Sequence, residues 1–354
     1  MCVGCFGWTD LRTGAVLPLA AMCLLVFGCG GDLSSDGFAG EDGSAGSVGT
    51  AGTNGSGGTF GGAGSGGTPG TGGSVPPTGD GISANYPNDV GIASDPSVIF
   101  ADGFDSYSSN NDLTGSGDWD NFYQAHNTSV DTTTSFSGAK SIRLRMPSTG
   151  SEVSNALVKN ISPAQDKLHI RVCARFQPGY AGMHSAHNGI GVNANYPGPG
   201  TIPNGNDFFL VNFEHLSQAQ VPEPGYHSVY VYHPEQDDNY GEHWFQDGHV
   251  SNGTQDFGDD FVPRTNTAPA LGTWLCHELM VQANTPGQRD GRVAIWENGV
   301  LLAEWVNIRF RDVAGVKMDR VYIENGGQGS SQQNDKWYDN LVVATEYIGP
   351  MASP

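Results

Sequence analysis

Short apolar stretches, many with apolar and polar residues in alternation, recur between residues 141 and 347 and are separated by clusters of Gly, Pro, Asn and Asp. Alternation with a period of two is typical of strands that bury one face. Two stretches flank Asn298-Gly299, the strongest short signal for a hairpin. We expect strands at 141–146, 168–176, 189–194, 207–215, 227–233, 274–283, 292–297, 300–306, 319–325 and 338–347. Because no stretch shows a long helical stripe, the pattern predicts an all-β fold, a β-sandwich or jelly roll.

Strand alternation places two cysteines on faces that point away from the core. In 168–176 the apolar residues take every second position, and Cys173 lies on the other side. In 274–282 Cys276 also faces away from the apolar side, whereas His277 falls on the apolar side. Two cysteines in an exported domain more often form a disulfide than a catalytic thiol. We therefore predict a disulfide between Cys173 and Cys276.

The stretch YHSVYVY at 226–232 places its tyrosines on one side and two valines on the other. A row of tyrosines on a sheet face offers a sugar ring an apolar plate with a polar tip. Tyrosine is also favoured in strands whatever their function. Tyr230 and Tyr232 are therefore either part of a sugar-binding face or ordinary strand residues.

The N-terminal 80 residues differ in composition from the rest. Residues 1–28 carry one basic residue, Arg12, before an apolar run too short to span a bilayer comfortably, as in a secretory signal. The run ends in VFGC, which resembles the lipobox of bacterial lipoproteins, in which the cysteine, here Cys29, is lipidated; the Phe is unusual there. A cleaved signal without lipid is the alternative. Residues 29–80, rich in Gly, Ser and Thr, predict a disordered tether, which leaves 81–354 as one β domain.

The charge balance bears on possible partners. The chain has 16 Lys plus Arg and 37 Asp plus Glu, a formal net charge of −21. Such a chain is unsuited to nucleic acid, whose binding depends on neutralising phosphates. The same balance counts mildly against a highly charged anionic polymer as substrate. We expect no nucleic-acid partner.

Several short segments occur in an order and spacing that resemble one family. They are FADGFDSY, TSFSGAKSIRLR, LHIRVCARFQ, GTWLCHELMV, DGRVAIWENGVLLA and KWYDNLVVA. Together they resemble the cellulose-induced fungal secreted protein family and its bacterial relatives over most of residues 97–348. That family has a jelly-roll core similar to glucuronan and alginate lyases. The resemblance implies a concanavalin A-like sandwich that binds or cleaves polysaccharide.

The same resemblance implies a structural calcium ion. In that family a calcium ion ties the first strand of the domain to the last. The matching positions here are Asp105, the backbone carbonyls near Ser137 and Lys140, and Asp339. Calcium takes oxygen ligands from carboxylates and carbonyls, and two acids between apolar strands need a partner. A pair of exposed acids at a strand edge is the alternative.

An acidic loop offers two weaker interpretations. Jelly-roll glucanases share a Glu-x-Asp-x-x-Glu motif, in which two carboxylates stand at hydrolytic spacing. Here Glu235 and Asp237 match, but Tyr240 stands where the second Glu belongs, so we set a hydrolase aside. The loop also holds five potential metal ligands, His233, Asp237, Asp238, Glu242 and His243. Their spacing matches no zinc pattern, and a solvated acidic loop is the simpler interpretation.

A lyase acting on uronates must neutralise the uronate carboxylate, remove the proton alpha to it and protonate the leaving oxygen. Arg171 or Arg175 could neutralise the carboxylate. His187 matches a histidine position of the family and would be the base, and Tyr230 or Tyr232 the acid. The Gln-x-His motif and the tyrosine-rich signature of alginate lyases are absent from this sequence.

Two functions from different classes follow from these observations. One is a tethered polysaccharide lyase that cleaves a uronate-containing polymer by β-elimination. The other is a non-catalytic jelly roll that binds polysaccharide. In both cases we expect an exported monomer that reaches the membrane only through a lipid anchor.

Overall fold

The structure is a computed structural model that describes residues 76–352 apart from 116–117, 182–185, 218–221, 254–256, 258–259 and 328–329. The predicted signal segment, Cys29 and nearly all of the predicted tether lie outside the described residues. The described chain contacts the domain from Pro77, whose carbonyl accepts a hydrogen bond from Trp296 Nε1 (2.8 Å). Among the described helices, none combines the length and the apolar character needed to cross a bilayer.

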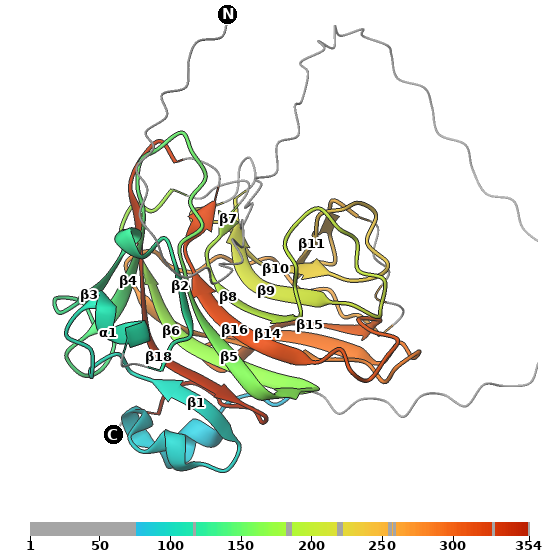
Figure 1. Ribbon diagram of the computed structural model, residues 1–354, viewed down its shortest axis with the longest axis horizontal. Helices are drawn as coiled ribbons and strands as arrows, with labels where there is room; N and C mark the ends of the chain where they lie inside the picture. Colours follow the sequence, from blue (N-terminus) through green and yellow to red (C-terminus); the bar gives the residue numbers. More distant parts are fainter. Residues whose placement is uncertain are drawn as a thin grey trace, which may run out of the picture.

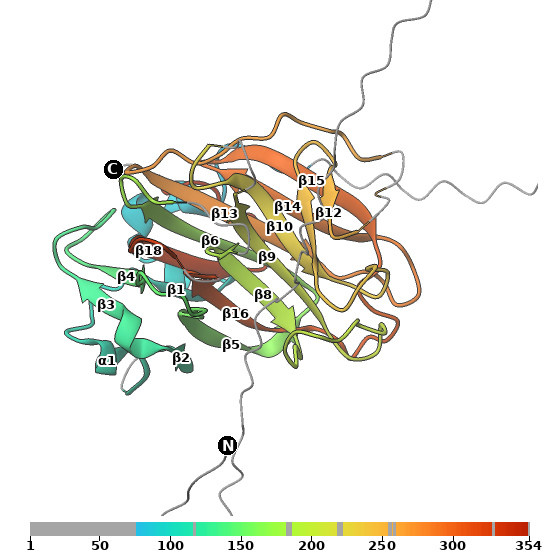
Figure 2. The same ribbon diagram turned by 90° about the horizontal axis from the view of Figure 1, so that it is seen from above.

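Two antiparallel eight-stranded sheets form the molecule, and we call them sheet I and sheet II. Sheet I runs in the order β15 (Val300–Ile308), β14 (Gly291–Glu297), β13 (Trp274–Gln282), β6 (Lys167–Phe176), β18 (Asn334–Ala344), β4 (Ser141–Met146), β3 (Thr128–Asp131), with β1 (Val98–Asp102) also paired to β18. Sheet II runs in the order β12 (Val250–Ser251), β11 (Glu242–Phe245), β10 (Tyr226–Tyr232), β9 (Phe209–Leu216), β8 (Ile190–Ala194), β16 (Met318–Glu324), β5 (Ala156–Gln165), β2 (Asn121–Tyr123). A third, short ladder pairs β17 (Gly326–Gly327) with β7 (Ala186–His187). Figures 1 and 2 show the sheets from two directions.

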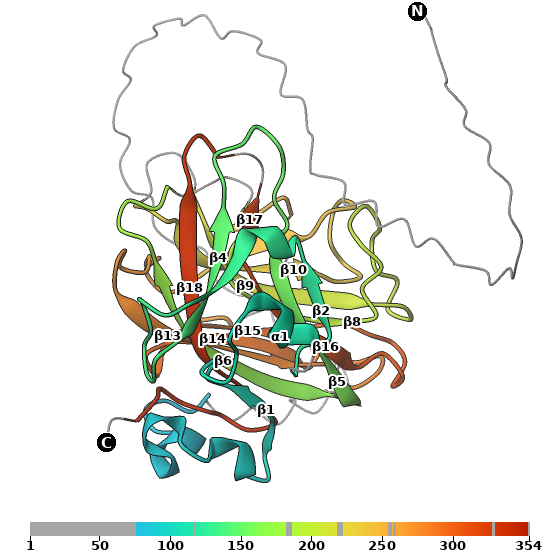
Figure 3. The same cartoon turned by 60° about the vertical axis from the view of Figure 1, so that its left-hand side comes forward.

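Helical elements are few and short in the described chain. They are α1 (Asn110–Gly115) and the 3-10 turns η1 (Ile82–Asn85), η2 (Pro87–Asp89), η3 (Ile92–Ser94) and η4 (Ala125–Asn127). Ile92 of η3 packs against Val342 and Ile348 in a small apolar cluster on the outer face of sheet I. Figure 3 shows the first three turns, in blue, gathered beside β1. The start of the described chain therefore covers part of sheet I.

The main core lies between the two sheets. Val172 and Leu279 reach it from sheet I, and Val211 and Phe213 reach it from sheet II. All four side chains are buried, and burial of a side chain of this size stabilises by roughly 1.5–3 kcal/mol. This arrangement confirms the predicted all-β sandwich.

The predicted hairpin is present between β14 and β15. Its two central residues, Asn298 and Gly299, have φ angles of 49° and 78°. Positive φ at both positions is what a tight two-residue hairpin turn requires, and Asn and Gly adopt it at low cost.

The predicted disulfide is also present. Cys173 on β6 and Cys276 on β13 lie directly opposite in register and are joined by a disulfide. Neither belongs to the main core, in agreement with their expected position on the other face of sheet I. The bond links two strands whose cysteines are 103 residues apart in sequence.

Candidate functional site: a polar cluster on sheet II

Polar side chains gather on the face of sheet II that points away from the main core. On its central strands the apolar residues take the inner side, so the alternate residues emerge on the outer side. Cross-strand register places Asn212 opposite Tyr230, and Tyr230 opposite His243. We call this group the polar cluster; its members are His187, Asn212, Glu214, Tyr230, His243, Tyr322 and Glu324.

A glycine lets two members of the cluster meet across an intervening strand. Strand β8 lies between β9 and β16, and its Gly191 pairs with Asn212 on one side and Tyr322 on the other. A Cβ atom at Gly191 would lie 2.1 Å from the Tyr322 ring and 2.5 Å from Asn212 Oδ1. Because that space holds no side chain, the Tyr322 hydroxyl donates a hydrogen bond to Asn212 Oδ1.

The centre of the cluster is a histidine–glutamate pair. His187 Nδ1 lies 2.8 Å from Glu214 Oε1, which also accepts a hydrogen bond from Asn212 Nδ2 (2.7 Å). The other oxygen, Glu214 Oε2, is buried and has no hydrogen-bond partner among the described residues. The His187 side chain is 35% exposed, whereas that of Glu214 is fully buried. His187, on β7, is therefore the part of the pair that solvent reaches; Figure 1 shows β7 near β9.

A second carboxyl group completes this centre. Glu324 Oε1 accepts a hydrogen bond from Asn212 Nδ2 (3.2 Å). Ligand-type atoms of His187, Glu214 and Glu324 all lie within 4.8 Å of one another. The carboxyl groups of Glu214 and Glu324 thus both lie near the His187 imidazole. This proximity changes the pKa values of His187 and Glu324.

The pKa values of the two half-buried titrating groups are both raised. Burial lowers the pKa of His187, but the charge and hydrogen bond of Glu214 outweigh burial, and the pKa rises to about 9. Burial raises the pKa of Glu324 to about 8, the Glu214 charge adds to this, and the His187 charge opposes it. Near neutral pH the centre therefore holds an imidazolium and a protonated carboxyl group.

The aromatic members surround this centre. The ring of Tyr230 lies 5.4 Å from that of His187 and 4.6 Å from that of His243. Tyr230 Oη accepts a hydrogen bond from Gly241 N (3.0 Å). The predicted tyrosine row is present, but Tyr232 is fully buried and packs with Phe208, so it offers no open plate to a sugar.

His243 differs from His187 in its environment. Its side chain is buried, and its Nδ1 atom has no hydrogen-bond partner among the described residues. Burial lowers the pKa of His243 to about 4. His243 is therefore a neutral imidazole at the pH values at which His187 is a cation.

The two predicted arginines lie elsewhere. Arg171 and Arg175 project from the outer face of sheet I, on the opposite side of the sandwich from the polar cluster. Arg171 is 1% exposed and pairs with Asp89 of η2. Arg175 donates to the Gly272 carbonyl (3.0 Å) and lies over the Trp337 ring. Sequence alternation gave the correct face of the strand, but that face is not the one that carries His187, so the structure does not bring these residues together.

The acidic loop contributes one residue to the cluster, His243. His233 Nε2 lies 3.0 Å from Glu242 Oε2, and both side chains are buried. Glu235 pairs with Arg289 at the surface. Of the five potential metal ligands of this loop, His233 and Glu242 thus form a buried pair and His243 belongs to the cluster.

The predicted calcium positions meet where the first and last strands pair. β1 and β18 lie side by side. Asp105 Oδ1 accepts from Lys140 N (2.9 Å), and Asp339 Oδ2 accepts from Ser137 N (3.2 Å). The structure thus places the amides of Ser137 and Lys140, and not the expected carbonyls, against the two carboxylates. A Cβ at Gly138 would lie 1.9 Å from Asp105 Oδ2, so the loop holds this oxygen closely.

The electrostatics at this place favour a cation. Burial raises the pKa of Asp339 to about 7 against three backbone amides that lower it, and the Asp105 charge raises it further. A cavity of about 230 Å³ lined by Asp89, Asp102 and Asp105, among others, lies beside it. Asp105 and Asp339 therefore fit a hard divalent cation, which oxygen ligands of this kind hold.

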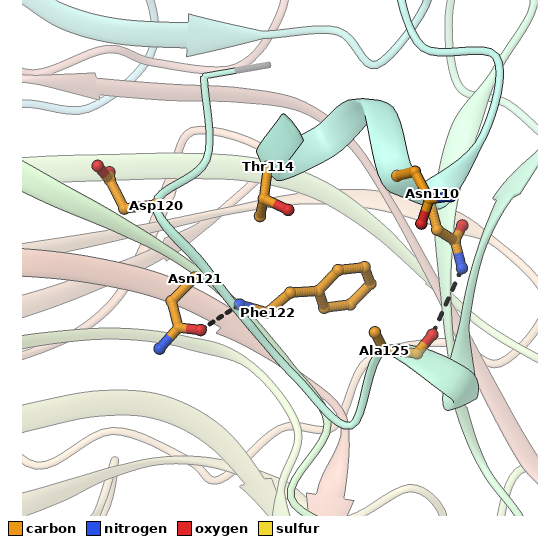
Figure 4. A pocket seen from close by; sticks show the side chains of 7 residues that line it. Asn110, Thr114, Asp120, Asn121, Phe122 and Ala125 are labelled. Atoms are coloured by element: carbon orange, nitrogen blue, oxygen red, sulfur yellow. Dashed lines mark hydrogen bonds between the residues drawn. The ribbon is translucent and has the colours of Figure 1, made fainter. Parts of the chain in front are cut away.

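A larger surface cavity lies away from the polar cluster. It has a volume of about 340 Å³ and lies between α1 and β2; Asn110, Asp120 and Phe122 are among its lining residues. Figure 4 shows Phe122 in its middle and the hydrogen bond from Asn110 to the Ala125 carbonyl. Asp120, its one acidic lining residue, pairs with Lys159 (3.3 Å). Since acid–base chemistry needs more than one titrating group, we do not place the active site here.

Most of the cluster escaped the sequence-based prediction. Only His187 and Tyr230 were named as catalytic candidates, and the four others with polar chemistry at the centre, Asn212, Glu214, Tyr322 and Glu324, were not. The signal was present: NFEH at 212–215 and YIEN at 322–325 alternate polar and apolar residues within predicted strands. Nothing in one sequence, however, says that β9 and β16 are separated by a single strand.

Comparison with known proteins finds similar structures. The sequence matches no family model and no curated protein. A variant of an alginate lyase in complex with an alginate trisaccharide is 14% identical, with a TM-score of 0.50 over 71% of this chain and 98% of that one. An alginate lyase from Aplysia kurodai is 14% identical, with a TM-score of 0.50 over 70% of this chain and 99% of that one.

A cellulose-induced protein is also similar, at 16% identity and a TM-score of 0.40 over 71% of this chain and 99% of that one. At these identities the likeness concerns the fold alone. The likeness to the two alginate lyases confirms the predicted jelly-roll sandwich and gives no residue a role. The chain therefore has a jelly-roll fold of the kind found in polysaccharide lyases.

Proposed function

We propose that the protein is a polysaccharide lyase that cleaves a uronate-containing polymer by β-elimination at the polar cluster. The observation that carries the proposal is the His187–Glu214–Glu324 centre, where an imidazolium and a carboxyl group with a raised pKa stand together. Perturbed titrating groups of this kind are concentrated at functional sites. The likeness of the fold to alginate lyases adds support.

His187 neutralises the uronate carboxylate in this proposal. A pKa of about 9 keeps the ring protonated at neutral pH, which makes it a poor base and a good counter-ion. This assignment replaces the role of base that the sequence resemblance implied. Glu214 holds the ring through Nδ1 and leaves Nε2 for the substrate.

Glu324 is the base. It takes the proton alpha to the carboxylate, the electron pair of that bond forms the new double bond, and the bond to the leaving glycosidic oxygen breaks. A base is most effective when its pKa lies near the working pH, and the pKa of Glu324 is raised to about 8. Its half-buried side chain is also open to substrate.

Tyr230 protonates the leaving oxygen. Its hydroxyl belongs to the same face, and its ring is 5.4 Å from that of His187. Neutral His243, whose ring is 4.6 Å from that of Tyr230, adds no positive charge that would compete with His187 for the carboxylate.

The roles predict a bell-shaped dependence of activity on pH. Activity rises with pH as Glu324 loses its proton, around pH 8, and falls as His187 loses its proton, around pH 9. The optimum is therefore alkaline. An optimum below pH 6 would contradict the assignment of Glu324 as the base.

The decisive experiment follows the ultraviolet absorbance of unsaturated uronate ends with glucuronan, alginate and a pectin-type polymer. We expect product from at least one polymer with the wild type and loss of product with His187→Gln. His249→Gln is the matched control, because His249 is exposed on a turn far along the chain from the centre. No product from any of the polymers would reject the lyase function.

A second function, binding without cleavage, has one observation in its favour. The chain has a net charge of −21, and two carboxyl groups stand at the centre of the cluster, which suits a neutral glycan better than a polyanion. Saturable binding of a neutral glycan to the wild type, weakened by His187→Gln and with no unsaturated product, would support this alternative.

We further propose that the mature protein is exported and anchored through a lipid on Cys29. The apolar segment, the VFGC sequence and the Gly-rich tether support this. The disulfide within the domain suits an oxidising compartment. The wild type should enter the detergent phase on phase separation, and Cys29→Ala should not; equal partitioning would reject the anchor.

A further inference from the structure

Two cross-strand pairs face each other inside the sandwich. On sheet II, His215 and His227 lie opposite in register on β9 and β10. On sheet I, His277 and Glu297 lie opposite in register on β13 and β14. All four residues share the side of their strand with the main core, so both pairs point into the space between the sheets.

The polar atoms of these side chains converge. Glu297 Oε2 lies 3.1 Å from His227 Nε2 and 3.1 Å from His277 Nε2. Ring nitrogens of the three histidines lie within 4.8 Å of one another. His215, His227 and His277 are 1%, 1% and 2% exposed. Three buried imidazoles thus meet, and Glu297, whose side chain is 23% exposed, reaches two of them.

One atom of this group lacks a partner. His215 Nε2 is buried and has no hydrogen-bond partner among the described residues. Buried polar atoms are nearly always satisfied, and an exception calls for an explanation such as an unseen ion. The ring centroids of the other two histidines are each 5.1 Å from that of His215. The unpartnered nitrogen of His215 therefore lies close to other potential metal ligands.

The outer nitrogens of two rings are already held by protein oxygens. His227 Nδ1 lies 2.7 Å from the Thr267 carbonyl oxygen. His215 Nδ1 lies 3.3 Å from Asn188 Oδ1. Histidines that bind metals typically donate their second ring N–H to an oxygen of this kind, which fixes the tautomer and turns the other nitrogen toward the ion.

We propose that His215, His227, His277 and Glu297 form a closed site for a divalent transition-metal ion, with zinc the first choice. Three imidazoles and one carboxylate match the nitrogen and oxygen ligands of tetrahedral zinc, at about 2.0–2.2 Å from the metal. A set dominated by imidazole selects zinc over calcium, which takes oxygen ligands. Four protein ligands fill the tetrahedron, so the ion is structural.

The site joins the two sheets and supports the polar cluster. Two ligands come from each sheet, so the ion crosslinks them through the interior. His215 directly follows Glu214, and Asn188, which holds His215, directly follows His187. The ion therefore fixes the two chain segments that carry the central pair of the cluster. The inference does not depend on which reaction the cluster performs.

Metal content of the full chain tests the proposal. The protein is produced in zinc-supplemented medium, dialysed and analysed for metals, for the wild type, His215→Gln, His277→Gln and the control His249→Gln. We expect about one zinc ion per chain in the wild type and control, and a large loss in both ligand variants. The variants are needed because the chain also has cysteines at 2, 5, 23 and 29, which are potential zinc ligands.

Cobalt in place of zinc gives a second readout that needs no variant. Production with cobalt should give the wild type the visible absorption bands of tetrahedral cobalt with nitrogen and oxygen ligands, without the intense sulfur-to-metal bands that cysteine ligands add. Wild type without bound zinc or cobalt would overturn the proposal. Zinc content equal in wild type and His215→Gln, or cobalt bands dominated by sulfur, would overturn it as well.

Discussion

The outer faces of the two sheets both carry buried charged groups, and sheet I satisfies more of them, although Arg171 Nε has no partner among the described residues. On sheet I, both terminal nitrogens of Arg171 bind partners, and both oxygens of Glu278 accept hydrogen bonds, from His169 Nδ1, Ile348 N and Gly349 N. On sheet II, Glu214 Oε2 and His243 Nδ1 have no partner among the described residues. The charged groups on sheet I bind other segments of the chain. The groups on sheet II include polar atoms that have no partner among the described residues.

The difference follows from what covers each face. The 3-10 turns and the C-terminal residues lie on sheet I and bring Ser83, Asp89 and the amides of Ile348 and Gly349 to its charges. On sheet II, half-buried Glu324 and His187 remain open to solvent. A buried polar atom without a partner costs stability, and so does the raised pKa of Glu324 at neutral pH, and proteins retain such groups where they serve function.

Removal of the base should have the largest effect. We expect Glu324→Gln to lower kcat by about 10²–10⁴-fold, because a positioned acid or base contributes that much, while the melting temperature stays within a few degrees of the wild type. Measured kcat on the polymer that the wild type cleaves tests this. A variant with more than a tenth of the wild-type kcat would place the base elsewhere.

Removal of a buried charge on sheet I should lower the stability and leave the activity unchanged. Arg171→Met removes one partner of a buried ion pair and leaves Asp89 without it, so we expect a loss of about 3–5 kcal/mol in the free energy of unfolding. Urea denaturation measures this, and activity per folded molecule should stay at the wild-type level. Loss of activity in folded Arg171→Met would mean that Arg171 takes part in the active site after all.

How far the sequence predicts these two faces depends on the kind of contact. Alternation within a strand put Cys173, Arg171 and Tyr230 on the correct side of their strands, because the period of two is fixed by backbone geometry. Short strands such as β2 and β12 were missed, since two or three residues carry too little pattern. The ten-residue β5 was missed as well, because its second half contains Pro163, and a proline within a run argues against a strand.

Apart from the Cys173–Cys276 crosslink and the hairpin at Asn298-Gly299, relations between strands were beyond prediction. The meeting of Asn212 with Tyr322 depends on the order β9-β8-β16 and on Gly191 in the middle. The burial of Arg171 depends on η2, more than 80 residues earlier in the chain. His277 did show, by alternation, that it lies on the core side, but its partners His215 and His227 belong to the other sheet.

The disulfide should contribute less than the buried ion pair. A variant with both Cys173→Ala and Cys276→Ala should lose about 2–4 kcal/mol, because the crosslink restricts the unfolded chain. Chemical denaturation of the oxidised wild type and the double variant measures the difference, and the activity of folded protein should not change. Two titratable thiols in the unreduced wild-type domain would mean that the bond does not form in solution.

Calcium bound where the first and last strands pair should have the smallest effect on stability. Its effect tests whether sheet I also has carboxylates that lack a partner. The carboxylates of Asp105 and Asp339 accept hydrogen bonds from backbone amides of the loop from Phe136 to Lys140, and the Lys140 ammonium donates to the Asp105 carbonyl oxygen (2.8 Å). An ion that binds the folded state alone stabilises it by about 2.7 kcal/mol at a hundredfold excess over its Kd. We therefore expect calcium to raise the melting temperature of the wild type and a chelator to lower it. Asp339→Asn should respond little to either, because it lacks one of the two carboxylates. Asp247→Asn, exposed in the turn between β11 and β12 of sheet II, serves as the control and should respond as the wild type does. Activity should follow the folded fraction only, since the polar cluster lies on the other sheet. A wild-type melting temperature that ignores both calcium and chelator would show that the loop amides alone satisfy Asp339, and that the outer face of sheet I is complete without an ion.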